Sequence, residues 1–199
     1  MRLAIFCSGN GSNFQAIVDS LKAKDIPATV VLMLTDQPGA FALKRAKQEG
    51  IKSVAVERKN FKNKEDFEAE IIRQLEQENI GLICLAGYMR LVGPGLIRKY
   101  PGKILNIHPA LLPAFKGTRA IKDAWDYGAK VTGVSVHFVD KEMDHGPIIL
   151  QQAVEIKDND TEQSLAERIH QVEHKLYPRA VKLFVAGKLK IAGRKVIIC

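Results

Sequence analysis

Apolar runs alternate with amphipathic segments along most of the chain. Short continuous apolar runs predict buried strands, and segments whose apolar residues recur every three to four positions predict helices. Strands are expected at Leu3–Cys7, Thr29–Leu34, Ser53–Val56, Leu82–Leu85 and Lys103–Ile107. Helices are expected at Asn13–Lys24, Phe41–Glu49, Lys64–Glu78 and about Pro94–Arg98. Continuous apolar strands that alternate with helices are typical of a parallel sheet covered on both faces.

The pattern changes after residue 107. A proline-rich loop leads into a helix at Ala120–Tyr127, and two long strands are expected at Val131–Val139 and Pro147–Ile156. The connection between these strands is short enough for a hairpin. A last long helix is expected to begin near Asp160 or Thr161, where Asp160 and Gln163 resemble a capping box. We therefore predict an α/β fold, a Rossmann-like three-layer sandwich with a mostly parallel sheet and an antiparallel element near the C-terminal half.

Length and composition favour one domain. A chain of 199 residues fits a single domain with a sizeable core. No apolar run approaches the ~20 residues that a membrane span needs, and the N-terminal apolar stretch is too short for a secretory signal. We expect a cytoplasmic protein that does not bind a membrane. Cys7, Cys84 and Cys199 form no CxxC pair, so reduced thiols are expected rather than a disulfide framework or a zinc site.

The formal net charge of +8 is compatible with nucleic-acid binding. However, the lysines and arginines are scattered through helix-like segments, often beside acids, and no basic arm with interleaved aromatic residues is present. This distribution favours a solvated, mildly basic surface and no nucleic-acid partner. The alternative predicts association that weakens steeply with salt.

A glycine-rich loop, Ser8–Asn13, lies where the first strand turns into the first helix. Backbone N–H groups at such a turn bind phosphate well. Phe14 stands where a dinucleotide fingerprint needs its third glycine, and no Gly-Lys-Ser/Thr follows as in a P-loop. We expect the loop to hold one phosphate of a small metabolite. Ser12 or Asn13 could equally serve as the helix N-cap.

Asn106 and His108 lie two residues apart at the carboxyl end of a predicted strand, so their side chains share one face. Ligands of open α/β sheets bind at these strand ends. A capping asparagine and a surface histidine would also explain the pair. Asp144 lies in a turn before Gly146 and Pro147, where a plain β-turn is an equally good interpretation. A carboxylate beside an imidazole would favour its protonated form.

Five motifs together resemble the phosphoribosylglycinamide formyltransferase family of folate-dependent purine-pathway enzymes. They are Gly9-Asn-Gly-Ser-Asn13, Ala86-Gly-Tyr-Met-Arg-Leu91, Asn106-Ile-His-Pro-Ala-Leu-Leu-Pro113, Ser135-Val-His-Phe-Val139 and Asp144-His-Gly-Pro-Ile148. The resemblance runs in order from residue 1 to about residue 187. It implies formyl transfer from 10-formyltetrahydrofolate, a co-substrate, to the amine of glycinamide ribonucleotide, without a metal. It also implies a single formyltransferase domain over 1–199, with a phosphate-binding half (1–100), a catalytic and folate half (101–187) and a tail (188–199).

The resemblance also implies the role of each site residue. Asn106 would hold the formyl oxygen and contact the folate, His108 would transfer the proton, and Asp144 would support His108. The remaining roles are phosphate binding by Gly11, Ser12 and Asn13, folate binding by Lys64, Met89, Arg90, Leu91 and Val92, and contact with the ribose or amine of the substrate by Glu173. Lys64 stands where the family usually has arginine, and His145 replaces a small residue.

Two alternatives stay open beside nucleic-acid binding. One is another folate-dependent formyltransferase, such as one acting on methionyl-tRNA, or a formyl-folate hydrolase; both should carry an extra domain. Another is a nucleotide-binding module without catalytic activity. The oligomeric state, monomer or homodimer, is undetermined.

The segment His170-Gln-Val-Glu-His174 has the spacing of an inverted zinc-protease motif, but no acidic residue follows Glu173, so no metal site is expected. His137 is expected to be a hydrogen-bonded sheet residue rather than a catalyst.

Overall fold

The computed structural model describes residues 1–23 and 27–199, and the chain divides into two compact units, Met1–Leu105 and Asn106–Cys199. Lys24, the last residue of the first predicted helix, lies outside the described residues. Each unit is described by itself. The division falls within strand β5 (Ile104–His108), whose last three residues open the second unit.

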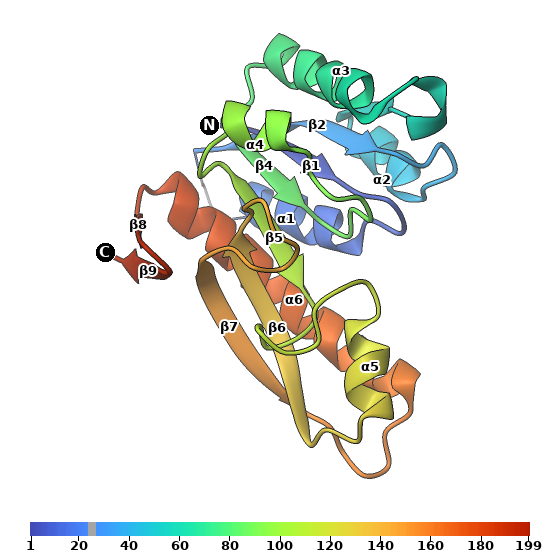
Figure 1. Cartoon of the computed structure of the whole chain (residues 1–199), viewed down its shortest axis with the longest axis vertical. Helices are drawn as coiled ribbons and strands as arrows, with labels where there is room; N and C mark the ends of the chain where they lie inside the picture. The colour runs from blue at the N-terminus through green and yellow to red at the C-terminus, as the bar shows by residue number, and fades with distance from the viewer. Residues whose placement is uncertain (24–26) are drawn as a thin grey trace. The chain divides into compact units, whose positions relative to one another are not determined.

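The first unit is built on parallel strands. They are β1 (Arg2–Phe6), β2 (Thr29–Thr35), β3 (Lys52–Ala55) and β4 (Leu82–Leu85), in the order β3-β2-β1-β4. The helices are α1 (Ser12–Ala23), α2 (Ala42–Gln48), α3 (Lys64–Gln77) and α4 (Pro94–Lys99), with a 3-10 turn, η1, at Arg58–Asn60. Figure 1 shows α3 and α4 on one face of this sheet and α1 on the other. Leu3 to Phe6 of β1 are fully buried, as expected for a strand covered on both faces.

The strand order reverses direction between β1 and β4. The chain proceeds from β1 outward to β3 and then returns to place β4 on the other side of β1. The loops that follow β1 and β4 meet at this point, where the Ser8 N–H donates to the Gly87 carbonyl oxygen at 2.9 Å. Such a reversal is where doubly wound sheets bind their ligands.

The second unit contains the antiparallel element. Strands β6 (Val131–Phe138) and β7 (Ile148–Glu155) pair antiparallel, with an irregularity between Val136 and His137. Helix α6 (Glu162–Val185) packs against both strands and against α5 (Ala120–Asp126). The predicted fold class is confirmed: mostly parallel strands with flanking helices and an antiparallel C-terminal part.

The capping box of α6 differs from expectation. It is formed by Thr161 and Ser164, each side chain accepting the backbone N–H of the other, rather than by Asp160 and Gln163. Asp160 instead pairs with Arg168 and accepts from the Ser164 hydroxyl. A hydroxyl one position later therefore takes the capping role, because the Asp160 carboxylate is engaged by a guanidinium.

The segment expected as a tail folds into a hairpin. Strands β8 (Leu189–Ala192) and β9 (Lys195–Ile198) pair antiparallel, and β9 meets β7 where Lys195 lies opposite Ile148. In the part of the chain that the structure describes, no helix is long and apolar enough to cross a bilayer.

Candidate active site

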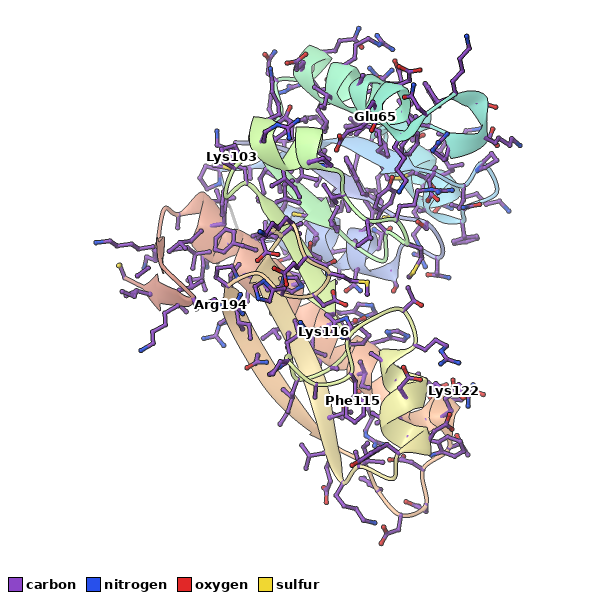
Figure 2. All side chains as sticks on the ribbon, viewed as in Figure 1. Glu65, Lys103, Phe115, Lys116, Lys122 and Arg194 are labelled. Atoms are coloured by element: carbon purple, nitrogen blue, oxygen red, sulfur yellow. The ribbon has the colours of Figure 1, made fainter. Side chains whose placement is uncertain are left out.

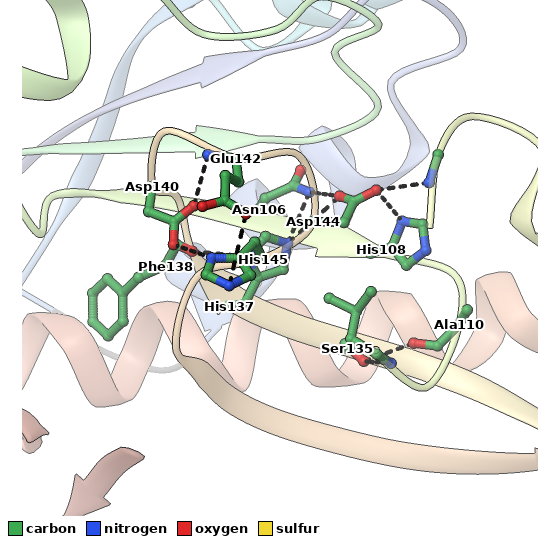
Figure 3. Close-up of polar contacts among 12 residues, drawn as sticks. Asn106, His108, Ala110, Ser135, His137, Phe138, Asp140, Glu142, Asp144 and His145 are labelled. Atoms are coloured by element: carbon green, nitrogen blue, oxygen red, sulfur yellow. Dashed lines mark hydrogen bonds and ion pairs between the residues drawn. The ribbon is translucent and has the colours of Figure 1, made fainter. Parts of the chain in front are cut away.

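The second unit brings Asn106, His108 and Asp144 together (Figure 3). His108 Nδ1 lies 3.4 Å from Asp144 Oδ2, and Asn106 Nδ2 donates to Asp144 Oδ1 at 3.3 Å. All three side chains are buried or nearly so, with His108 only 3% exposed. The predicted meeting of the imidazole and the carboxylate, which are far apart in sequence, is present in the structure.

The backbone fixes where each of these side chains points. Asn106 and His108 lie on one face of β5 because side chains two apart in a strand share a face. Asp144, in the β6–β7 connection, takes a positive φ of 48°. Only glycine fits at position 146, since a Cβ there would lie 1.8 Å from the Phe138 carbonyl oxygen. The Gly117 N–H donates to Asp144 Oδ2 at 2.9 Å and so fixes the carboxylate.

His137 also belongs to this cluster, which was not predicted from the sequence. It is buried on β6, and its Nε2 lies 3.1 Å from Asn106 Nδ2. Its Nδ1 lies 2.7 Å from the Phe138 carbonyl oxygen, which can only accept, so Nδ1 carries the proton and Nε2 accepts from Asn106. His137 is a hydrogen-bonded sheet residue, as expected, and it also orients Asn106. The sequence did offer one signal for this role: side chains alternate along a strand, so His137 is expected on the same face of β6 as Ser135.

The environment of His108 acts on its pKa in two directions. Burial, the larger effect, lowers the pKa, while the Asp144 carboxylate and the Phe115 carbonyl raise it; the net pKa lies below the ordinary value. His108 Nε2 donates to the Phe115 carbonyl oxygen at 2.8 Å. Nε2 therefore carries the proton of the neutral ring, and Nδ1 presents a lone pair toward Asp144. Protonation at Nδ1 would give this carboxylate a charged donor.

The pKa of Asp144 is also shifted. Burial acts to raise it, but the Gly117 N–H and the positive charge of a protonated His108 lower it below the ordinary value. His137 Nε2 lies 3.8 Å from Asp144 Oδ1, beyond hydrogen-bond distance, so the neutral ring acts on this carboxylate only through Asn106. Asp144 is ionised at neutral pH.

Ser135 holds the loop that follows His108. Its hydroxyl donates to the Ala110 carbonyl oxygen at 2.6 Å and accepts from the Leu112 N–H at 3.0 Å. Gln151, opposite Ser135 in β7, donates to the same hydroxyl and to the Leu112 carbonyl oxygen. The β6–β7 hairpin thus fixes the loop that supplies Phe115 and Gly117 to the cluster.

In the first unit, the glycine-rich loop ends at α1 as predicted. The Gly11 carbonyl accepts from the Gln15 N–H at 3.0 Å, so the helix begins at Ser12 and the N–H groups of its first turn are outside the helical ladder. Gly11 precedes the helix in the N-cap position, and neither Ser12 nor Asn13 takes it. Gly11 has φ of 74°, and a Cβ there would lie 2.7 Å from Ala42 Cβ of α2.

The predicted folate segment, residues 89–92, follows β4 and is tied to the glycine-rich loop by Asp36. This carboxylate is only 4% exposed; it accepts from the Ser8 hydroxyl at 2.5 Å and from Arg90 Nε at 2.7 Å. The Met89 N–H donates to the same Ser8 hydroxyl at 2.8 Å. Met89 and Leu91 are 61% and 74% exposed, unusually high for large apolar side chains. Asp36 was not singled out from the sequence.

The other predicted residues lie as follows. Lys64 is the first residue of α3 and is exposed. Glu173 is 4% exposed on α6, and its carboxylate accepts from His170 Nδ1 at 2.9 Å, a contact that raises the pKa of His170. Among the described residues, no group of three or more histidines, cysteines and acids is arranged to hold a metal ion.

Known proteins match most of this chain. The family model described as "Formyl transferase" matches residues 1–181. The chain belongs to the formyl transferase family. It is 50% identical over 181 residues to a phosphoribosylglycinamide formyltransferase of Bacillus subtilis, covering 91% of this chain and 93% of that protein. A crystal structure of glycinamide ribonucleotide transformylase 1 from Symbiobacterium toebii matches with a TM-score of 0.97 and 41% identity, over all of this chain and 93% of the other.

The formyl transferase match also includes larger proteins. The trifunctional purine biosynthetic protein adenosine-3 of Homo sapiens is 39% identical over the whole of this chain, which spans 20% of that protein. The family model ends at residue 181, so the β8–β9 hairpin lies beyond the matched region.

Proposed function

We propose that this chain transfers the formyl group of 10-formyltetrahydrofolate to the amine of glycinamide ribonucleotide, giving the formylated ribonucleotide of purine biosynthesis. The observation that carries the proposal is the buried Asn106–Asp144–His108 cluster in a chain half identical to a phosphoribosylglycinamide formyltransferase. The transfer needs an acceptor for one proton, a donor of one proton and a group that stabilises an oxyanion. The cluster offers all three without a metal.

The chemistry follows in two steps. The substrate amine attacks the formyl carbon, a C–N bond forms, and the carbonyl oxygen becomes an oxyanion. Asn106 donates an amide N–H to this oxygen, giving up the 3.3 Å bond to Asp144, the longer of its two. The bond from the formyl carbon to the folate N10 then breaks, and N10 gains a proton while the new amide loses one.

His108 moves that proton. Because burial keeps its pKa low, the ring is neutral at pH 7 and can accept the proton of the attacking amine. The proton is accepted at Nδ1, which carries none in the neutral ring, and the resulting imidazolium is stabilised by Asp144 and delivers its Nε2 proton to N10. Transfer through Nε2 requires its bond to the Phe115 carbonyl to be exchanged for one to the substrate.

Binding roles follow the family resemblance. The first-turn N–H groups near Gly11, Ser12 and Asn13 would bind the substrate phosphate. Glu173 would contact the ribose or amine. The folate would lie against Asn106 and against a set formed by Lys64, Met89, Arg90, Leu91 and Val92, where the exposed Met89 and Leu91 supply apolar surface. Lys64 offers a point charge where arginine would offer a fork, so its contact is the weaker.

The test is an assay with 10-formyltetrahydrofolate and glycinamide ribonucleotide on the wild type, His108→Ala and Asp144→Asn. Loss of one oxyanion donor or proton carrier typically costs ~10²–10⁴ in rate. We expect kcat to fall by about that factor in both variants. Asp126→Asn is the matched control, because Asp126 is an exposed carboxylate paired with Lys122 on α5. Absence of wild-type turnover would overturn the proposal.

The same assay separates the alternatives. A formyl-folate hydrolase would consume 10-formyltetrahydrofolate without glycinamide ribonucleotide, and a nucleotide-binding module would bind the ribonucleotide without turnover. Nucleic-acid binding would show as association that falls steeply between low and high salt. We further propose a cytoplasmic enzyme of one domain, a monomer or homodimer, with no metal, nucleic-acid or membrane partner.

A further inference from the structure

The C-terminal hairpin contacts the segment that carries Asp144. Arg194 lies in the turn between β8 and β9, and Figure 2 labels it there. Its Nη1 donates to the carbonyl oxygen of His145 at 2.6 Å. This contact joins residues 49 positions apart and fixes the His145–Gly146 peptide, one residue beyond Asp144.

The same guanidinium also packs on the His145 ring. Nη1 lies 3.2 Å from both ring nitrogens, and an atom equally close to both lies against the face of the ring. In the plane of the ring, Nδ1 donates to Asp140 Oδ2 at 2.7 Å. His145 is therefore held between the carboxylate that begins the β6–β7 connection and the guanidinium of the hairpin.

The clamp matters because the residues between Asp140 and Asp144 are exposed, with the Glu142 N–H donating to Asp140 Oδ1 at 2.9 Å. Asp144 follows them with a positive φ, a conformation that a non-glycine residue keeps only where its surroundings impose it. Anchors on both sides of residues 141–144, at Asp140 and at His145, impose that conformation. The orientation of the Asp144 carboxylate toward His108 depends on it.

We propose that Arg194 is a positioning residue, which holds Asp144 against His108 by clamping His145 from the C-terminal hairpin. Arg194 lies beyond the residues that the family model matches, and His145 stands where the family resemblance leads us to expect a small residue. The kinetic part of the test rests on the proposed function; the structural part does not.

The kinetic test compares Arg194→Ala, Arg194→Lys and the control Lys190→Ala, which removes an exposed cation from β8 of the same hairpin. A hydrogen bond from a charged donor is worth enough to change a population about tenfold or more. We expect Arg194→Ala to lower kcat by about that factor and to leave KM for both substrates within about twofold. Arg194→Lys should recover part of the loss, because an ammonium can reach the carbonyl but cannot lie flat on the ring.

Two measurements do not need turnover. Hydrogen exchange should accelerate at the amides of residues 140–146 in Arg194→Ala and stay unchanged in Lys190→Ala. NMR titration should show the pKa of His108 falling further in Arg194→Ala, because Asp144 is the largest influence that raises it; the other groups facing His108 are His137, Glu173 and the Phe115 carbonyl. A thermal unfolding curve on each variant identifies any loss caused by global destabilisation.

The outcomes separate the two proposals. Accelerated exchange and a lowered His108 pKa in Arg194→Ala support the clamp, even if the wild type fails to turn over and the proposed function falls. If wild type turns over and Arg194→Ala matches Lys190→Ala in kcat, in exchange and in the His108 titration, the clamp is overturned and the proposed function stands. Equal losses of kcat in Arg194→Ala and Lys190→Ala would also overturn the clamp.

Discussion

At the scale of single residues, His108 has an acceptor at each ring nitrogen and is buried. The Phe115 carbonyl lies 2.8 Å from Nε2, and the Asp144 carboxylate lies 3.4 Å from Nδ1. Two acceptors favour the imidazolium, while burial disfavours it, and burial is the larger effect. Burial therefore decides that the His108 pKa is lowered, and the distance to Asp144 decides how far.

Asp144→Asn tests this balance through pH. The substitution removes the negative charge that raises the His108 pKa, so that pKa should fall further below 6.5. A base with a lower pKa stays neutral to lower pH. The acidic limb of the kcat/KM profile should therefore move to lower pH in the variant, while the plateau falls by ~10²-fold or more.

Direct titration of the His108 ring by NMR checks the same shift without turnover. Asp126→Asn should leave both the titration and the acidic limb at their wild-type positions. A His108 pKa that rises in Asp144→Asn would contradict the assignment, since it would mean that burial, not the carboxylate, changed on substitution.

Only part of this site was readable from residue types. The two-residue spacing of Asn106 and His108 predicts a shared face, which β5 provides. Asp144 was identified by family resemblance, because a turn carboxylate has no periodicity. The contacts from the Phe115 carbonyl and the Gly117 N–H are made by backbone, which every residue carries, so side-chain chemistry could not reveal them.

At the scale of elements, the turn from β1 into α1 depends on one glycine. Gly11→Ala would place a Cβ 2.7 Å from Ala42 Cβ at a φ of 74°. A strained backbone of this kind costs ~1–3 kcal/mol, so Tm should fall by several degrees. Because α2 or the loop must shift, affinity for glycinamide ribonucleotide, measured by calorimetry, should also weaken.

Gly9→Ala is the matched comparison for stability, because nothing lies within 4 Å of a Cβ at that position and its φ is not positive. Its Tm should stay within about a degree or two of the wild type, the range of an unstrained surface substitution. Equal Tm losses in both variants would show that the loop tolerates neither side chain, and that the close approach of Ala42 is not the cause.

Strands and helices were predicted to within one or two residues where hydrophobic period and burial agree. Leu82–Leu85 of β4, for example, is a run of four buried apolar residues bounded by glycines at 81 and 87. The β8–β9 hairpin was predicted only as a tail, because most of its residues, including Ile197 and Ile198, are exposed and give no buried face that would define two strands. The α6 capping box was assigned one residue too early, because four adjacent residues, Asp158 to Thr161, are all of types favoured at an N-cap.

At the scale of the whole molecule, the chain's two compact units share one strand. β5 begins in Met1–Leu105 and ends in Asn106–Cys199. A strand cannot keep its first two residues ordered while its last three unfold without losing ladder hydrogen bonds at the junction. That the chain behaves as one domain stays a prediction made from its length.

Unfolding monitored by two probes tests that prediction. Trp125, the single tryptophan, lies on α5 in the second unit and is 39% exposed, so its fluorescence reports that unit alone. Far-UV circular dichroism reports the helices of both units. If the chain unfolds as one cooperative domain, the two denaturant curves share one midpoint and one slope. A fluorescence transition displaced from the dichroism transition, or a dichroism curve with two steps, would show that the units unfold separately. In that case the unit that contains His108 and the unit that contains the glycine-rich loop would unfold in separate transitions. A ligand that binds one unit would then stabilise only the transition of that unit.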